Sequence, residues 1–177
     1  MKTILISLTV LIVVVVAVGV VTPKDYSVVS TVTIQAPPER VHEYLGDLKR
    51  WPEWAPWHEE DPTIVTTFGP TTTGAGASQT WTGDSGDGEL TFTRSDPKSG
   101  ISYDMAFLSD GERFPATVTI DYADKGGATE ITWVMEGSWK GIVPPVMDGW
   151  MKLMTPWMIG GSFDRGLANL KAVVEAG

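Results

Sequence analysis

Few residues of this chain have the types and spacing that chemistry requires. The sequence has two histidines and no cysteine, which excludes thiolate nucleophiles, disulfides and cysteine-type zinc sites. The cluster at 58–61 (HEED) contains metal-ligand types, but adjacent side chains of one loop rarely converge on a single ion. The acidic, glycine-rich segment 84–89 lacks the ligand spacing of a calcium loop and reads as a hairpin turn. We therefore expect no metal and no other cofactor.

Paired carboxylates are the second kind of chemistry to consider, because cyclases and dehydratases need an acid and a base. The acids of the predicted strands all alternate onto the outward face: Asp104, Asp121, Glu130 and Glu136. No carboxylate pair therefore faces the predicted interior. Arg94 and Tyr103 alternate inward, and together they could polarise a carbonyl and protonate an enolate. This pair keeps an enzymatic alternative open.

The elements that position these residues follow from the pattern of polarity. A strand with period-2 alternation is expected over 26–35, followed by a helix that starts at the prolines 37–38. Further strands are expected near 63–68, 75–82, 89–94, 101–108, 114–122 and 129–138, separated by Gly, Pro and Asp turns. From the prolines 144–145 to the end of the chain the spacing is helical, with a break or kink expected at Pro156 and the glycines 160–161. This order predicts an α+β fold in which a curved antiparallel sheet wraps around the long C-terminal helix.

The inward faces of these strands are large, aromatic and rich in methionine, with few polar members. A few polar groups in an apolar concavity are typical of a small-molecule pocket. For each residue alone, an ordinary place in the core is the alternative. We predict entry past the turns at 110–111 and 141–145 and the following ligand-binding residues: Gln79, Trp81, Arg94, Tyr103, Met105, Phe107, Trp133, Met135, Trp150 and Met154.

The N-terminal segment 4–21 is an uncharged run made mostly of Ile, Leu and Val. A helix of this length rises about 27 Å, close to the thickness of a bilayer core. We predict an uncleaved transmembrane anchor with a linker over 1–25 and one soluble domain over 26–177; a cleaved secretory signal is the alternative. The charge of Lys2 places the N-terminus in the cytoplasm and the domain outside it, as in a single-pass membrane protein.

The net charge of −9 limits the partners. Without a basic stripe the chain is a poor partner for nucleic acid, and broad electrostatic docking on anionic lipid is disfavoured. The eight tryptophans either close one end of the cavity or rest at a membrane interface. The sequence predicts no oligomeric state.

Four stretches, in this order along the chain, resemble the polyketide cyclase/dehydrase-like branch of the START-type (SRPBCC) superfamily. They are 36–41 (APPERV) after a strand, the cluster Trp51, Trp54 and Trp57, 132–137 (TWVMEG) and 166–171 (GLANLK). The likeness runs from Tyr26 to the C-terminus. It implies a helix-grip fold, with a seven-stranded sheet that grips the C-terminal helix over a deep cavity. It also implies an apolar ligand such as a lipid, sterol or polyketide.

This branch has no universal catalytic motif, so no catalytic residue is carried over. The leading expectation is a membrane-anchored carrier or sensor for a hydrophobic small molecule. The alternatives are a cyclase or dehydratase that acts in the same cavity, and a structural or partner-binding module, which would be marked by an exposed apolar patch.

Overall fold

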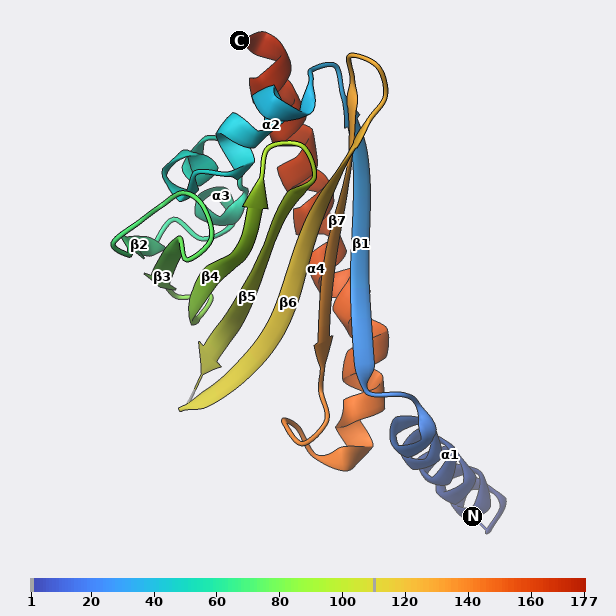
Figure 1. Ribbon diagram of the computed structural model, residues 1–177. Coiled ribbons are helices and arrows are strands. Elements are labelled where there is room, and N and C mark those ends of the chain that lie inside the picture. The colour runs from blue at the N-terminus through green and yellow to red at the C-terminus, as the bar shows by residue number, and fades with distance from the viewer. Residues whose placement is uncertain (1, 110) are drawn as a thin grey trace.

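The computed structural model describes residues 2–109 and 111–177, with all side chains in these ranges except those at positions 3 and 5 (Figure 1). Its helical elements are α1 (Lys2–Val21), α2 (Pro38–Leu45), the 3-10 helix η1 (Leu48–Glu53), α3 (Trp57–Glu60) and α4 (Pro145–Ala176). Its strands are β1 (Asp25–Ile34), β2 (Val65–Phe68), β3 (Ser78–Thr82), β4 (Asp87–Asp96), β5 (Gly100–Ser109), β6 (Glu112–Asp124) and β7 (Thr129–Ser138).

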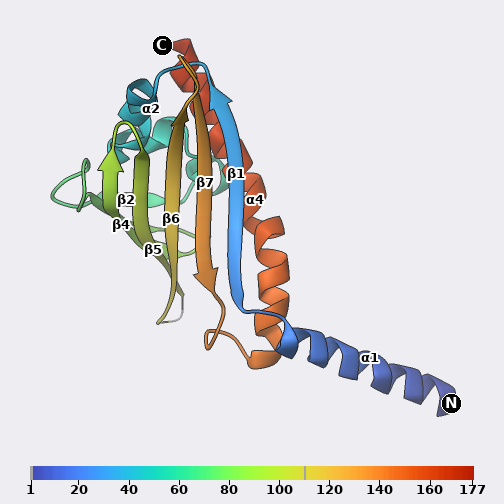
Figure 2. The ribbon, with the colours of Figure 1, turned by 45° about the vertical axis from the view of Figure 1, so that its right-hand side comes forward.

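The strands form one curved antiparallel sheet in the order β1-β7-β6-β5-β4-β3-β2. Consecutive strands from β2 to β7 pair in turn, and β1 forms the other edge by pairing along its whole length with β7, from Asp25 opposite Ser138 to Ile34 opposite Thr129. Helix α4 runs along the concave face of the sheet, while α2, η1 and α3 lie towards the edge formed by β2 to β4 (Figures 1 and 2). The predicted α+β class and the helix-grip arrangement of sheet and C-terminal helix are confirmed.

The core lies between the sheet and the second half of α4. Phe163, Leu167, Leu170 and Val174 recur at intervals of four, three and four residues and are all buried, as the helical period requires. Opposite them, alternate residues of β1, β5, β6 and β7 are buried. The core therefore consists of the buried side chains of α4 packed against the inward-facing side chains of the sheet.

Two local predictions need correction. Helix α4 is continuous from Pro145 to Ala176, so the break that was expected at Pro156 and the glycine pair at 160–161 does not occur. A proline removes a single backbone donor, and the packing of this helix along β1 holds it together despite that loss. Strand β3 begins at Ser78 rather than at 75, because Gly74 and Gly76 adopt φ angles of 76° and 87°, outside the extended region.

The structure corrects the prediction of a single-pass membrane anchor, with the N-terminus in the cytoplasm and the domain outside. Among the described residues, no helix is both long enough and apolar enough to cross a membrane. The predicted attachment to a membrane through this helix is therefore not supported.

Helix α1 projects away from the sheet and touches the protein at the first turns of α4 (Figure 2). The two helices approach closely because glycines lie at the contact: a Cβ atom on Gly19 would lie 1.9 Å from the Val146 carbonyl oxygen. The indole Nε1 of Trp150 donates a hydrogen bond to the Val15 carbonyl at 3.1 Å. Trp150 is therefore committed to the contact with α1.

Candidate functional site

A cavity of about 250 Å³ lies between the concave face of the sheet, the η1–α3 segment and the middle of α4. Its walls are mainly aromatic and aliphatic side chains, which come from β2, β3, β4, β5 and β7 on one side and from the helices on the other. Pockets for drug-sized ligands usually occupy about 300–1,000 Å³. This cavity therefore suits a compact molecule.

The predicted ligand-binding residues of the strands mostly meet in this cavity. Its lining includes Gln79, Trp81, Tyr103, Met105, Phe107, Trp133 and Met135. The register explains why they meet: Gln79 lies opposite Leu90 on β4, and Leu90 lies opposite Met105 on β5. Residues in one such row point to the same face of a sheet.

Trp81 reaches over its neighbouring strand because that strand has a glycine there. Trp81 pairs with Gly88, and Gly88 pairs with Phe107. A Cβ atom at Gly88 would lie 2.1 Å from Trp81 Cζ2, so only glycine leaves room for the indole. The ring then meets Phe107 edge to face, with the centroids 5.9 Å apart.

Arg94 lies outside the cavity, which separates it from Tyr103. A β-bulge between Phe92 and Arg94 puts Arg94 opposite Ser102, one position out of phase with the inward residues. The side chain forms an ion pair with Asp121, with 2.6 Å between Nη2 and Oδ1. The two groups of the predicted enzymatic mechanism are therefore not brought together.

Two further predicted residues belong to other surfaces. Trp150 packs against α1, as described above, and Met154 is exposed on α4 without lining the cavity. The helical phase explains both, because stepping back from Phe163 by four residues leads to Ile159 and Thr155, which are partly and fully buried. Of the predicted entrance, Asp110 lies outside the described residues, and none of 141–145 lines the cavity.

Sequence reasoning missed which residues of the helices line the cavity. Trp51 and Trp57 from the η1–α3 segment, and Met158, Ile159 and Phe163 from α4, complete the wall opposite the sheet. The tryptophan cluster at 51–57 was the available signal, and its packing at one end of the cavity was one of the two expected roles. Trp54 lies behind the wall, fully buried, with its Nε1 donating to the Tyr44 carbonyl at 3.3 Å.

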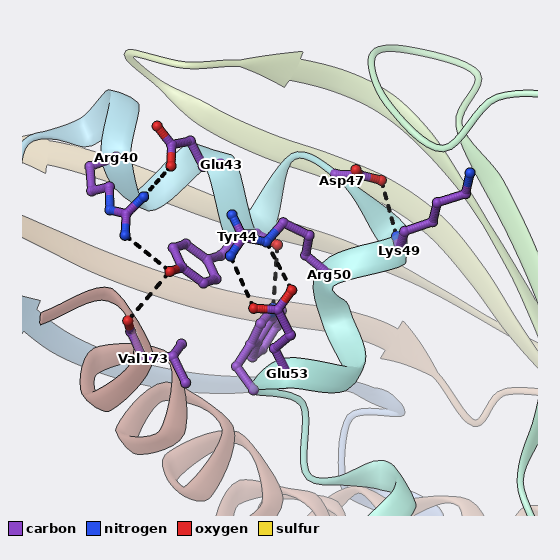
Figure 3. A network of polar contacts seen from close by, with 9 residues as sticks. Arg40, Glu43, Tyr44, Asp47, Lys49, Arg50, Glu53 and Val173 are labelled. Atoms are coloured by element: carbon purple, nitrogen blue, oxygen red, sulfur yellow. Dashed lines mark hydrogen bonds and ion pairs between the residues drawn. The ribbon is translucent and has the colours of Figure 1, made fainter. Parts of the chain in front are cut away.

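A polar network fixes the segment that carries Trp51 (Figure 3). The Tyr44 hydroxyl accepts a hydrogen bond from Arg40 at 3.1 Å and donates one to the Val173 carbonyl at 3.4 Å. The guanidinium of Arg50 stacks over the Tyr44 ring, 3.6 Å from its centroid, and also binds Glu53. The network ties α2 and η1 to the C-terminal part of α4.

The ring contacts hold the deep wall of the cavity rigidly. Trp133 stacks on Phe163 with 4.1 Å between centroids and 14° between planes, and it meets Trp54 and Trp57 edge to face. Tyr103 stacks on Phe92 and meets Trp51 at a centroid distance of 5.5 Å. Such pairs each add about 0.5–1.5 kcal/mol beyond the burial of their area.

Few groups in the cavity can titrate or pair with charge. Burial raises the pKa of Tyr103 well above its usual value, so the hydroxyl keeps its proton. At the rim, Glu60 accepts hydrogen bonds from Ser162 and Arg165, both at 3.0 Å, and so ties α3 to α4. His58 also lines the rim.

His42 on α2 is partly buried where this helix packs against the sheet. Its two ring nitrogens lie 3.3 Å from the Tyr122 hydroxyl and 3.2 Å from the Ser95 hydroxyl. Burial lowers the pKa of His42, and Asp96 opposes this effect more weakly. Within the described part of the chain, no three His, Asp or Glu side chains are grouped so that they could hold a metal ion.

Comparison with known proteins gives one family and several similar folds. The family model described as polyketide cyclase / dehydrase and lipid transport matches residues 25–175. A crystal structure of protein CV1439 from Chromobacterium violaceum is 19% identical, with a TM-score of 0.61 over 84% of this chain and 96% of that one. An uncharacterised protein from Rhizobium leguminosarum is 13% identical, with a TM-score of 0.62 over 88% and 98% of the two chains.

DynU16, a protein of the dynemicin biosynthetic locus, is 19% identical, with a TM-score of 0.53 over 84% of this chain and 47% of that one. At these identities the likeness concerns the fold. A comparison with curated protein sequences found no match.

Proposed function

The chain belongs to the polyketide cyclase/dehydrase and lipid transport family, and from this membership and its cavity we propose that it binds a compact hydrophobic molecule between the sheet and α4. The single observation that carries the proposal is the aromatic cavity of about 250 Å³. Close-packed cores leave few voids larger than a water molecule. A void of this size inside an apolar wall is therefore best explained by a ligand.

The shape of the walls narrows the ligand class. Flat aromatic side chains contribute much of the lining, including Trp51, Trp57, Trp81 and Trp133. Aromatic faces give large contact area at little cost in side-chain entropy. A molecule of two or three fused rings fits this volume better than a long acyl chain or a sterol.

Binding is favoured over catalysis because the cavity lacks a free acid–base pair. Among the described residues that line it, the only carboxylate is that of Glu60, which is already bound to Ser162 and Arg165. Tyr103 is held protonated by burial and so is a poor general base. The family also includes cyclases and dehydrases, and the Tyr103 hydroxyl could polarise a ligand carbonyl, which is the observation that favours that second function.

The proposal is tested by titrating the full chain with N-phenyl-1-naphthylamine, a neutral aromatic dye whose fluorescence rises in apolar surroundings. We expect saturable binding with one dye per chain. Thr66→Trp should block it, because Thr66 lines the cavity from β2. Thr67→Trp is the matched control, since Thr67 is the exposed neighbour on the same strand.

Two results would contradict the proposal: no saturable binding by the wild-type chain, or equal loss of binding in both variants. For the second function, the same chain is incubated with aromatic β-polyketone substrates and the products are followed by mass spectrometry. Turnover that is lost in Tyr103→Phe while dye binding persists would support catalysis, and unchanged turnover would remove Tyr103 from it.

A further inference from the structure

The indole N–H of Trp133 is the most unusual polar group near the cavity. Trp133 is 1% exposed, and its Nε1 has no hydrogen-bond partner among the described residues. An unpaired buried donor is costly in a native structure and calls for an explanation. The other tryptophans with buried rings show the contrast, since Nε1 of Trp51 and of Trp54 each donate to a backbone carbonyl.

The ring of Trp133 cannot turn to find a partner. It is stacked on Phe163 and enclosed by Trp54 and Trp57 on its edges. The backbone is equally fixed, because β7 pairs on both sides, with Ser30 and Ile120 opposite Trp133. The fold therefore holds the donor in one direction.

Near this donor lies the hydroxyl of Tyr103, which like Gln79 is a buried polar group of the wall. Burial raises the pKa of Tyr103, and the nearby indole N–H of Trp133 lowers it by a smaller amount. The N–H and the hydroxyl do not, however, have the geometry of a hydrogen bond. Tyr103 is 3% exposed, and its hydroxyl makes no hydrogen bond to a described residue. An indole N–H can only donate, so the proton of the Tyr103 hydroxyl has to find an acceptor elsewhere.

The charge of the lining says what kind of acceptor this is. Among the described residues that line the cavity there is no lysine and no arginine, and Glu60 adds a negative charge at the rim. A ligand anion in the apolar interior, away from the exposed His58 at the rim, would lie without a counter-charge, which is strongly unfavourable. The uncharged oxygen of a ketone, quinone or ester can be buried there without this electrostatic cost.

We propose that Tyr103 and Trp133 form a polar subsite that binds one uncharged acceptor oxygen of the ligand, so that the ligand is an aromatic carbonyl compound and not a hydrocarbon or an acid. The Tyr103 hydroxyl donates the hydrogen bond, and the Trp133 N–H orients or reinforces it. The remainder of the ligand lies against the aromatic walls. This inference rests on the proposed function and specifies the ligand class of the same cavity.

The test compares two probes with the same three-ring skeleton, fluorenone and fluorene, by isothermal titration calorimetry on the full chain. The ketone gains one hydrogen bond between uncharged groups, and the buried Tyr103 hydroxyl then has a partner. This corresponds to a preference for fluorenone over fluorene of about tenfold. Tyr103→Phe should reduce this preference to less than about threefold and leave fluorene affinity within about twofold. Trp133→Phe should reduce it partly, since the ring stays stacked while the N–H is lost.

Infrared spectroscopy gives an independent signature. The carbonyl stretch of bound fluorenone should lie at lower frequency in the wild-type chain than in Tyr103→Phe, because a donated hydrogen bond weakens the C=O bond. The matched control is Tyr122→Phe, whose hydroxyl lies against His42 outside the cavity. This variant should keep the ketone preference.

The outcomes separate the inference from the function on which it rests. Equal affinity for the two probes in the wild-type chain overturns the polar subsite and leaves the binding of apolar molecules intact. Binding of neither probe overturns both. If Trp133→Phe fails to fold, the Tyr103→Phe comparison still decides, because an unchanged preference in that variant overturns the subsite.

Discussion

Replacement of Phe163 by alanine tests the two roles that the structure gives to this side chain. Phe163 is 3% exposed, lies on α4, stacks on Trp133 at 4.1 Å and lines the cavity. Truncation of a buried phenylalanine costs about 3–5 kcal/mol in the free energy of unfolding. This range includes about 1 kcal/mol for the lost aromatic stack.

The expected value lies at the lower end of this range, about 3 kcal/mol. The space left by the ring joins an existing cavity, so fewer neighbours lose contacts than at a fully packed site. The matched control is Leu170→Ala, two turns along the same helix, at 0% exposure and away from the cavity. It should cost about 2–5 kcal/mol and leave ligand binding unchanged.

Urea unfolding measures both variants, with the slope against denaturant as a check that the unfolded states are comparable. The cavity of Phe163→Ala is larger than that of the wild-type chain. Addition of N-phenyl-1-naphthylamine should therefore raise the free energy of unfolding more in this variant than in the wild-type chain. A ligand at a hundred times its Kd stabilises by about 2.7 kcal/mol. A loss below about 1 kcal/mol in Phe163→Ala, or equal recovery in Leu170→Ala, would refute the placement of this ring in both core and cavity wall.

Three further changes give clear expectations. Gly88→Ala should displace the Trp81 ring, because the added Cβ atom would lie 2.1 Å from it. Dye affinity, measured by fluorescence titration, should fall, and the free energy of unfolding in urea should decrease by about 1–3 kcal/mol. Glu60→Gln should speed dye release in stopped-flow experiments, because it weakens the tie between α3 and α4, while the loss of an exposed pair changes stability by less than about 1 kcal/mol. Burial lowers the pKa of His42 from 6.5, so as the pH falls the unfolded state binds a proton before the folded state does. The contribution of His42 to stability should therefore be complete above pH 6.5 and decline below it. His42→Gln should flatten this decline, measured as the difference between urea midpoints at pH 7.5 and 5.5.

The strands and their inward faces were predictable because period-2 alternation is a local property of the chain. Gln79, Met105 and Met135 reach the cavity by that alternation alone. Arg94 departs from it, since the bulge at β4 adds one residue and reverses the faces beyond it. Nothing in the local sequence around 92–94 signals such a bulge, because it depends on pairing with β5.

The helical part of the site was harder to predict. Trp150 and Met154 were predicted to bind the ligand, whereas the structure turns them to α1 and to solvent. The phase set by Phe163 and Leu167 would have pointed to Ile159 instead. The apolar run of α1 likewise predicted a membrane anchor, and the described part of the helix does not support one.

The sequence by itself determined the α+β class, the seven strands, the long C-terminal helix and the scarcity of catalytic groups, because composition and periodicity act over a few residues. Only the tertiary structure decided that Arg94 leaves the site, that the tryptophans of η1 and α3 enter it, and that Trp133 and Tyr103 line the same cavity. These facts depend on register and on which faces pack together. They join residues far apart in the chain, whose relation no local pattern records.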